Sequence, residues 1–152
     1  MTSETKAARA KAGAGAVRPL TDGDYRALAE FRYVLRRFHA FSEARAAEHG
    51  LTPQQHQAML AIRAAPGGVA TVGHVAERLL LKPHSATGLV HRLEAAGLVR
   101  RASSEHDRRQ SLLRLSAAGQ RRLDALSAVH REEIRRLRPA LGALLSEWDE
   151  RG

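Results

Sequence analysis

The most constraining feature of this sequence is residues 71–116, where two short helical patterns precede two short strand-like patterns. Thr71 is a favourable N-cap, and the apolar residues after it are spaced as on one face of a helix that ends near Leu81. Pro83 then begins a second helix, because proline at the first helical position loses no hydrogen bond and has the helical φ preset. We expect this second helix to run to Ala96, after a tight turn.

The second of these helices has one apolar face and one face of small or polar residues. Its apolar face consists of Ala86, Leu89, Val90 and Leu93. The opposite face carries His84, Ser85, Thr87, Gly88, His91 and Arg92. A helix that enters the major groove of DNA needs such a face, because its side chains must reach base edges while its bulk stays small. A solvated helix face without a ligand is the simpler alternative.

The pattern after this helix predicts a hairpin. Gly97 suits the end of the helix, and residues 98–102 and 111–115 are short segments with the composition of strands. Residues 103–107 between them are rich in turn-forming side chains. Ser116 is a good N-cap for a further helix. We call the hairpin the wing.

The wing is also rich in arginine. Arg101 lies on its first strand, and Arg108 and Arg109 follow Asp107 near its tip. Arginine suits the narrow, negative minor groove of DNA, and Asp107 can hold one guanidinium group through a charge-assisted hydrogen bond. The charge distribution points the same way, because residues 71–115 hold eight basic and four acidic residues in a chain of net charge +9. Such a distribution favours a polyanionic partner.

Three blocks of this region form a recognisable pattern: residues 93–101 (Leu-Glu-Ala-Ala-Gly-Leu-Val-Arg-Arg), residues 107–109 (Asp-Arg-Arg) and residues 115–119 (Leu-Ser-Ala-Ala-Gly). With their spacing, these blocks resemble the MarR family of bacterial transcription regulators. Ser116 stands where the family has threonine, and it keeps the capping hydroxyl. Ala86 and Gly88 depart more, because many members have a bulkier aliphatic residue and a long polar side chain there. At the base pairs that face Ala86 and Gly88, contacts are therefore expected from the backbone, or from His84 and His91.

The resemblance implies a mainly α fold (α+β with a small β-wing), in which a winged helix-turn-helix at residues 50–116 lies between N- and C-terminal dimerisation helices. It implies a sequence-specific DNA-binding regulator and not an enzyme: a homodimer on a pseudopalindromic operator, usually a repressor that a small ligand releases. The expected DNA-binding residues are Lys82, Pro83, His84, Ser85, Thr87, Gly88, His91 and Arg92 on the recognition helix, and Arg101, Asp107, Arg108 and Arg109 on the wing. His84, Ser85, Thr87 and His91 are assigned to base edges, Lys82 and Arg92 to phosphates, and Arg108 or Arg109 to the minor groove.

The segments that flank this region are predicted to dimerise. Residues 21–49, capped by Thr21 or Asp22, carry an apolar stripe of Tyr25, Leu28, Phe31, Val34, Leu35, Phe38 and Phe41. Residues 117–152 carry Leu123, Leu126, His130, Ile134, Leu137, Leu141, Leu144 and Trp148 in steps of three and four, which indicates packing against another helix. Pro139 is expected to kink or break this helix at about residues 135–139.

Two other segments are simpler to interpret. Residues 1–20 are basic and hold little that a core would bury, so we expect a disordered arm. Thr52 and Pro53 begin a further helix, in which Gln55 completes a capping box, and residues 66–68 (Pro-Gly-Gly) end it.

The sequence has no catalytic pattern, and we expect no cofactor and no bound metal. It lacks cysteine, which excludes disulfides and thiol switches, and its eight histidines do not have the spacing of a zinc hydrolase. His39, His49, His56 and His130 lie on segments that could converge in a dimer, so a metal-responsive regulator remains an alternative. A winged helix used for protein–protein contact is another, although such a module would not need the basic charge.

The aromatic stripe also offers an effector site. A pocket for a small aromatic or phenolic molecule is predicted at Phe31, Phe38, Phe41 and Met59. No apolar run is long enough for a membrane span and no secretory signal is evident, so a soluble cytoplasmic protein is expected.

Overall fold

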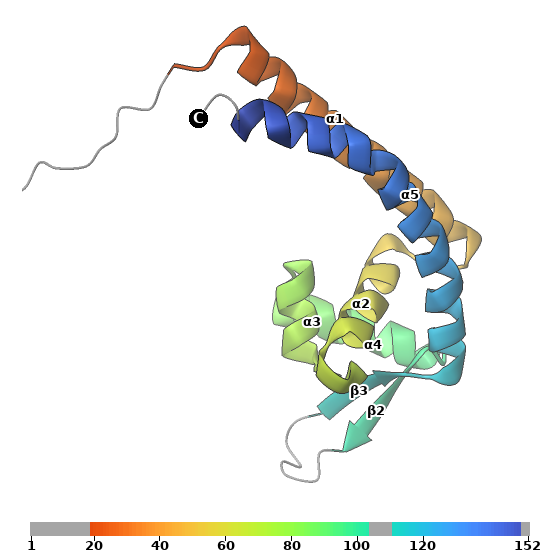
Figure 1. Cartoon of the computed structure of the whole chain (residues 1–152). Helices are drawn as coiled ribbons and strands as arrows, with labels where there is room; N and C mark the ends of the chain where they lie inside the picture. The colour runs from red at the N-terminus through yellow and green to blue at the C-terminus, as the bar shows by residue number, and fades with distance from the viewer. Residues whose placement is uncertain (1–18, 104–110, 150–152) are drawn as a thin grey trace, which may run out of the picture.

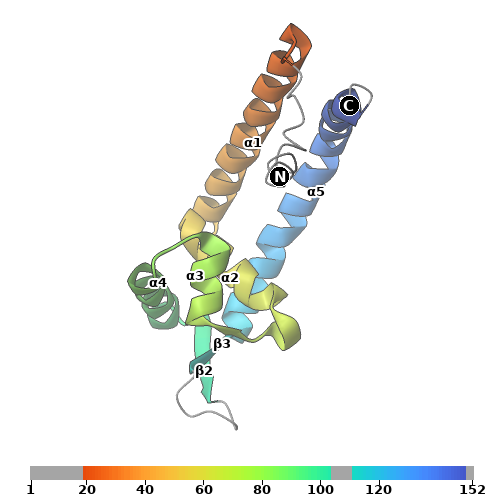
Figure 2. The ribbon, with the colours of Figure 1, turned by 90° about the vertical axis from the view of Figure 1, so that its left-hand side faces the viewer.

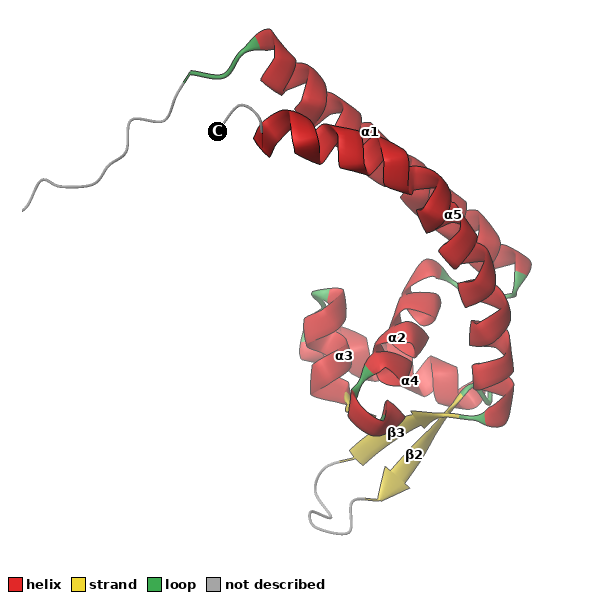
Figure 3. Cartoon of the chain, viewed as in Figure 1, coloured by secondary structure: helices red, strands yellow, loops and turns green. Residues whose placement is uncertain are grey.

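The computed structural model describes residues 19–103 and 111–149. Its elements in chain order are α1 (Asp22–Glu48), α2 (Pro53–Ala64), the 3-10 turn η1 (Pro66–Gly68), β1 (Ala70–Thr71), α3 (Val72–Leu79), α4 (Pro83–Ala95), β2 (Val99–Ser103), β3 (Ser111–Leu115) and α5 (Ala117–Asp149). Figure 3 shows that helices dominate and that the strands gather at one end of the molecule. The mainly α architecture with a small β-wing is confirmed.

The helices form a compact unit and an arm (Figures 1 and 2). The compact unit consists of α2, α3, α4, the three strands and the first turns of α5. The arm consists of α1 and the remainder of α5, which pack along each other and extend away from the compact unit in the same direction. None of the helices in the described part of the chain has a segment apolar enough to cross a lipid bilayer.

The first two helices begin where their capping side chains predict. Thr21 Oγ1 accepts a hydrogen bond from the Asp24 N–H at 3.2 Å, and the Asp24 carboxylate accepts one from the Thr21 N–H at 2.7 Å. Thr52 and Gln55 form the same reciprocal pair, with distances of 3.1 and 3.0 Å. Each cap stabilises its helix by about 1 kcal/mol, because it satisfies N–H groups that have no partner inside the helix.

The sheet has one strand more than the hairpin predicted from the sequence. Its order is β1-β3-β2, and both pairings are antiparallel. In the added pairing, Ala70 lies opposite Leu113 and Thr71 lies opposite Leu112. A strand of two residues is too short to show an alternating pattern, so tertiary contacts alone define it. It ties the start of α3 to the wing.

The core lies inside the compact unit. Its fully buried large side chains are Met59, Ile62, Val75, Leu89, Val90, Leu93, Leu98, Leu113, Leu123 and Leu126. Every helix of the compact unit contributes to this set, and so does the wing. The first turns of α5 belong to it through Leu123 and Leu126, so α5 joins the core of the compact unit to the arm.

The helix α5 is unbroken from Ala117 to Asp149, with Pro139 inside it. The predicted break at residues 135–139 is therefore wrong, and the ribbon in Figure 1 curves without interruption. Proline removes one backbone hydrogen bond from a helix, and a long helix that packs along a partner can bend and continue. Leu137 and Leu144 of the predicted apolar seam are buried, whereas Ile134 is 53% exposed.

The apolar stripe of α1 is only partly covered by this chain. Val34 is buried, but Tyr25 is 60% exposed and both Leu28 and Leu35 are 40% exposed. Large apolar side chains in a row on one helix face usually mark an interface. The arm thus presents an apolar surface that is available to a partner.

Candidate nucleic-acid interface

The two faces of α4 are those predicted from the sequence. Ala86, Leu89, Val90 and Leu93 are all buried. His84, Ser85, Thr87, His91 and Arg92 are exposed, Gly88 is half-buried, and Lys82 and Pro83 at the start of the helix are exposed. The helix is therefore anchored by its apolar stripe, and its whole polar face is open to a ligand.

The hydroxyl of Thr87 is fixed by its own helix. It donates a hydrogen bond to the Pro83 carbonyl at 3.0 Å, which leaves its oxygen to act as an acceptor. Within the described residues, the side chains of His84 and Ser85 make no hydrogen bond, so their donors and acceptors are free for a ligand. The N-terminal turn of α4 thus offers a set of small polar groups with one of them already oriented.

Gly88 and Arg92 share one site on the exposed face of α4. A Cβ atom built on Gly88 would stand 3.5 Å from Nη1 of Arg92. The arginine side chain therefore folds back along the helix towards the glycine. Because Gly88 has no side chain, the helix surface does not protrude there, and the Arg92 guanidinium group lies beside it.

The turn between α3 and α4 is held by an unusual residue. The predicted end of α3 near Leu81 is slightly too late, because α3 ends at Leu79 and Leu80 adopts a left-handed conformation with φ of 55°. The Leu81 N–H then donates to the Ala76 carbonyl at 2.8 Å, which closes the helix as a glycine at this position usually does. This turn fixes the angle at which α4 leaves α3.

Arg101 ties the wing to α4. Its Nε donates to Glu94 at 2.8 Å and its Nη1 donates to the hydroxyl of Ser111 at 2.7 Å. Both donors therefore form hydrogen bonds that hold the wing against α4. A DNA contact by Arg101 stays a prediction. Asp107, Arg108 and Arg109, which carry the rest of the wing prediction, lie outside the described residues.

Ser116 and Gly119 connect the wing to α5. The Ser116 hydroxyl donates to the Gly97 carbonyl at 2.6 Å and accepts from the Gly119 N–H at 3.0 Å, so Ser116 caps α5 as predicted. Gly119 packs directly on the backbone of Leu98, and a Cβ on it would overlap the Leu98 carbonyl oxygen. Only glycine allows this close approach of α5 to the wing.

The residues of the predicted effector pocket do not all come together. Phe38 and Phe41 pack edge-on against His130, with ring centroids 6.0 and 5.6 Å away. Phe31 lies further along α1 and is half-buried. Met59 is fully buried in the core of the compact unit. A cavity of about 440 Å³ beside Phe41 is lined by Phe41, Arg45, Ala128, Val129, Glu132 and Arg136.

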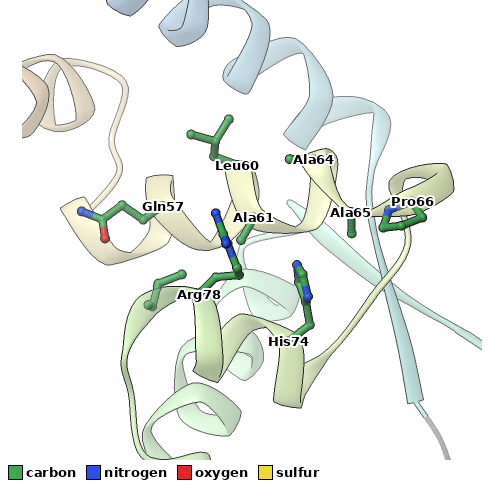
Figure 4. A pocket seen from close by; sticks show the side chains of 9 residues that line it. Gln57, Leu60, Ala61, Ala64, Ala65, Pro66, His74 and Arg78 are labelled. Atoms are coloured by element: carbon green, nitrogen blue, oxygen red, sulfur yellow. The ribbon is translucent and has the colours of Figure 1, made fainter. Parts of the chain in front are cut away.

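A larger groove lies between α2 and α3 and was not predicted. Its volume is about 630 Å³, and its lining includes Leu60, Ala61 and Ala64 of α2 and His74 and Arg78 of α3. Figure 4 shows Ala61 on the side of α2 towards α3, whereas Leu60 points away from α3. None of the four residues of the predicted effector pocket lines this groove. The sequence could not reveal it, because small apolar residues on α2 look like core positions until the packing of α3 is known.

Two of the four histidines considered above as possible metal ligands, His56 and His130, lie together within one chain, where α2 meets α5. The rings of His56 and His130 are 4.7 Å apart, and His130 Nε2 lies 2.8 Å from the Ser42 hydroxyl. Burial, followed by the nearby His130 and His49, lowers the pKa of His56 to about 4. Among residues 19–103 and 111–149, no three histidine or acidic side chains are grouped so as to hold a metal ion.

Comparisons with known proteins agree with this geometry. The sequence model of the MarR family matches residues 49–110, which include α2, α3, α4 and β2. No curated protein matches the sequence.

Solved structures match over most of the chain. AbsC, a MarR family transcriptional regulator from Streptomyces coelicolor, is 24% identical, with a TM-score of 0.69, and the match covers 88% of this chain and 92% of that one. YusO from Bacillus subtilis is 19% identical, with a TM-score of 0.62 and coverage of 84% and 94%. A point mutant of MepR from Staphylococcus aureus, bound to an oligodeoxyribonucleotide, is 18% identical, with a TM-score of 0.63 and coverage of 86% and 99%. At these identities the likeness concerns the fold.

Proposed function

Because this chain belongs to the MarR family of winged-helix transcription regulators, we propose that it binds double-stranded DNA sequence-specifically through α4 and the wing. One observation carries the proposal: α4 buries its apolar stripe completely and exposes only small, polar or basic side chains. That surface suits the major groove, where side chains read base edges. The MepR mutant that shares this fold was solved with an oligodeoxyribonucleotide, which supports the same class of partner.

The proposed roles follow from position on α4 and the wing. His84, Ser85, Thr87 and His91 contact base edges, and Lys82 and Arg92 contact phosphates. Arg108 or Arg109 enters the adjacent minor groove, where the negative potential of a narrow groove attracts a guanidinium group. The backbone at Pro83 and Gly88 approaches the DNA closely because neither residue projects a long side chain.

We propose further that the protein acts as a homodimer on a pseudopalindromic operator. The exposed apolar stripe of α1 supports this, because Tyr25, Leu28 and Leu35 need a partner to cover them. Two recognition helices in such a dimer stand about 34–36 Å apart, one turn of DNA. Repression, released by a small aromatic effector near Phe38 and Phe41, is the regulatory mode we propose; a ligand that prefers one spacing of the helices shifts the population to it.

The test compares three variants in a DNA-binding titration at several salt concentrations, on duplexes selected from a random pool. Alanine at both Arg108 and Arg109 should weaken binding to every sequence and reduce the salt slope by about one unit for each phosphate that is no longer neutralised. The substitution His91→Ala should change the preferred sequence more than the overall affinity. A double variant of exposed arginines on the side of α1 opposite its exposed apolar stripe, Arg26→Ala with Arg37→Ala, carries the same charge change and should bind as the parent does.

Two results would count against the proposal. Equal binding by the wing double variant and the parent protein would remove the wing from the interface. A parent protein that stays monomeric in sedimentation and ignores duplex DNA at low salt would overturn the function itself.

A further inference from the structure

The outer face of the wing carries two arginines directly opposite each other. Arg100 on β2 is the cross-strand partner of Arg114 on β3, and both side chains are exposed. Like charges at such a position destabilise a sheet. Within the described residues neither arginine forms an ion pair. The wing therefore holds a repulsive pair that its described acidic neighbours do not offset.

A third arginine meets this pair at the turn after α2. Arg114 Nη1 lies 3.4 Å from the Gly67 carbonyl oxygen, and Arg63 Nη1 lies 3.9 Å from the position of a Cβ on Gly68. The two guanidinium groups thus reach the same short turn from different elements. Together with Arg100, they line one hollow of about 440 Å³ at the base of the wing.

The rest of the hollow is neutral. Its other lining residues are Gly67, Gly68, Leu115, Ser116, Ala117 and Gln120. Gln120 donates to Asp124 at 2.7 Å, and Asp124 is not part of the lining. Three positive groups therefore surround a space that no carboxylate of the described residues enters, and an anion in that space would relieve their repulsion.

A phosphate group fits this arrangement better than a carboxylate does. Guanidinium groups bind planar pairs of oxygens, so a planar carboxylate satisfies one arginine. The terminal oxygens of a phosphate, three in a monoester and two in the DNA backbone, are arranged tetrahedrally and can face arginines that approach from different directions. We propose that Arg63, Arg100 and Arg114 form a phosphate-binding pocket at the base of the wing. The phosphate is either one of the DNA backbone, in which case the pocket extends the proposed interface, or that of a free phosphate ester.

The test uses the double substitution Arg100→Gln and Arg114→Gln in the full chain, with Arg63→Gln as a second variant. The control is Arg26→Gln with Arg37→Gln, which changes the charge equally on the side of α1 opposite its exposed apolar stripe. Removing the like-charge pair should leave the melting temperature in phosphate-free buffer unchanged or higher, so the variants are expected to fold.

The first experiment measures how inorganic phosphate changes the melting temperature. The melting temperature of the parent and of the control should be higher in phosphate than in chloride at the same ionic strength. This difference should be absent from both pocket variants. This result would show that the pocket takes a free phosphate, whether or not the protein binds DNA.

The second experiment measures affinity for a non-specific duplex against salt concentration. If the pocket holds a backbone phosphate, the pocket variants should bind about eightfold more weakly at 0.1 M salt for each phosphate released, and the slope should fall by about 0.9 for each. The control should match the parent. Pocket variants that equal the parent in both experiments would overturn the proposal. A parent that binds phosphate but no duplex would overturn the proposed DNA-binding function and leave the pocket standing.

Discussion

Replacing Gly88 by alanine should separate the stability of α4 from its contact with DNA. Gly88 lies inside α4, where glycine costs roughly 0.5–1 kcal/mol relative to alanine because its backbone loses more freedom on folding. The added Cβ would meet only Arg92 Nη1, at 3.5 Å, which is an ordinary contact with the end of a flexible side chain. The variant Gly88→Ala should therefore be more stable by about 0.5–1 kcal/mol, which raises the melting temperature of a chain of this size by roughly 1–4 °C.

The same methyl group should weaken DNA binding. If the backbone at Gly88 lies against the floor of the major groove, the methyl group and the displaced Arg92 side chain occupy the space that the DNA needs. The loss of binding free energy should be of the order of one good base contact, about 1–3 kcal/mol, which is roughly five- to 150-fold in affinity. A variant that is more stable and binds more weakly cannot be explained by partial unfolding.

The assay pairs urea denaturation with a DNA-binding titration on the same preparations. Gly142→Ala in α5 is the matched control, because a Cβ there meets no atom within 4 Å and the site is far along the arm from α4. It should show the same gain in stability with unchanged DNA binding. If Gly88→Ala binds DNA as tightly as Gly142→Ala does, Gly88 is not a point of close approach and the orientation proposed for α4 is wrong.

Two further substitutions, Gly119→Ala and His56→Leu, test the packing of the elements that hold α4 and the wing in place. Gly119→Ala places a Cβ on the Leu98 backbone, which cannot move aside as a side chain does, so we expect a loss of about 3 kcal/mol in urea denaturation. For His56, the pKa lowered to about 4 from 6.5 means that the unfolded chain binds the extra proton first as pH falls, so stability is full above pH 6.5 and is lost between pH 6.5 and 4. The loss should be about 1.4 kcal/mol per pH unit, and His56→Leu should abolish this part of the pH dependence; equal slopes for both proteins would show that His56 is not the group responsible.

The sequence predicted the parts of the fold that local chemistry decides. Pro83 and the apolar stripe that follows it define α4, and Gly97 ends it with φ of +70°. The capping box at Thr52 predicted the start of α2 in the same way, and of the two caps predicted for α1, Thr21 or Asp22, the structure has Thr21. Each of these signals lies within four residues of the structure it specifies, so a single sequence is enough to recognise it.

The features that were missed depend on contacts between distant segments. The strand β1 exists only because Ala70 and Thr71 lie beside β3. Leu80 gives no local sign of its left-handed φ, since glycine or asparagine normally marks such a position. Arg101 was assigned to DNA from its place in the wing, and its bonds to Glu94 and Ser111 follow from the packing of β2 on α4.

The joint between the compact unit and the arm is the place where the two parts of the chain are mechanically connected. The helix α5 belongs to the core through Leu123 and Leu126, and it packs in the arm through Leu137 and Leu144, so one continuous helix connects the two parts. His56, His130 and Ser42 lie where α2, α5 and α1 meet, and His56 Nδ1 is buried there without a hydrogen-bond partner among the described residues. A polar atom left unsatisfied in this position makes the joint less stable than an apolar contact would. On the proposed function, we expect a partner or effector that changes the packing at this joint to change the direction of α4, and thereby the distance between the two recognition helices of the proposed dimer.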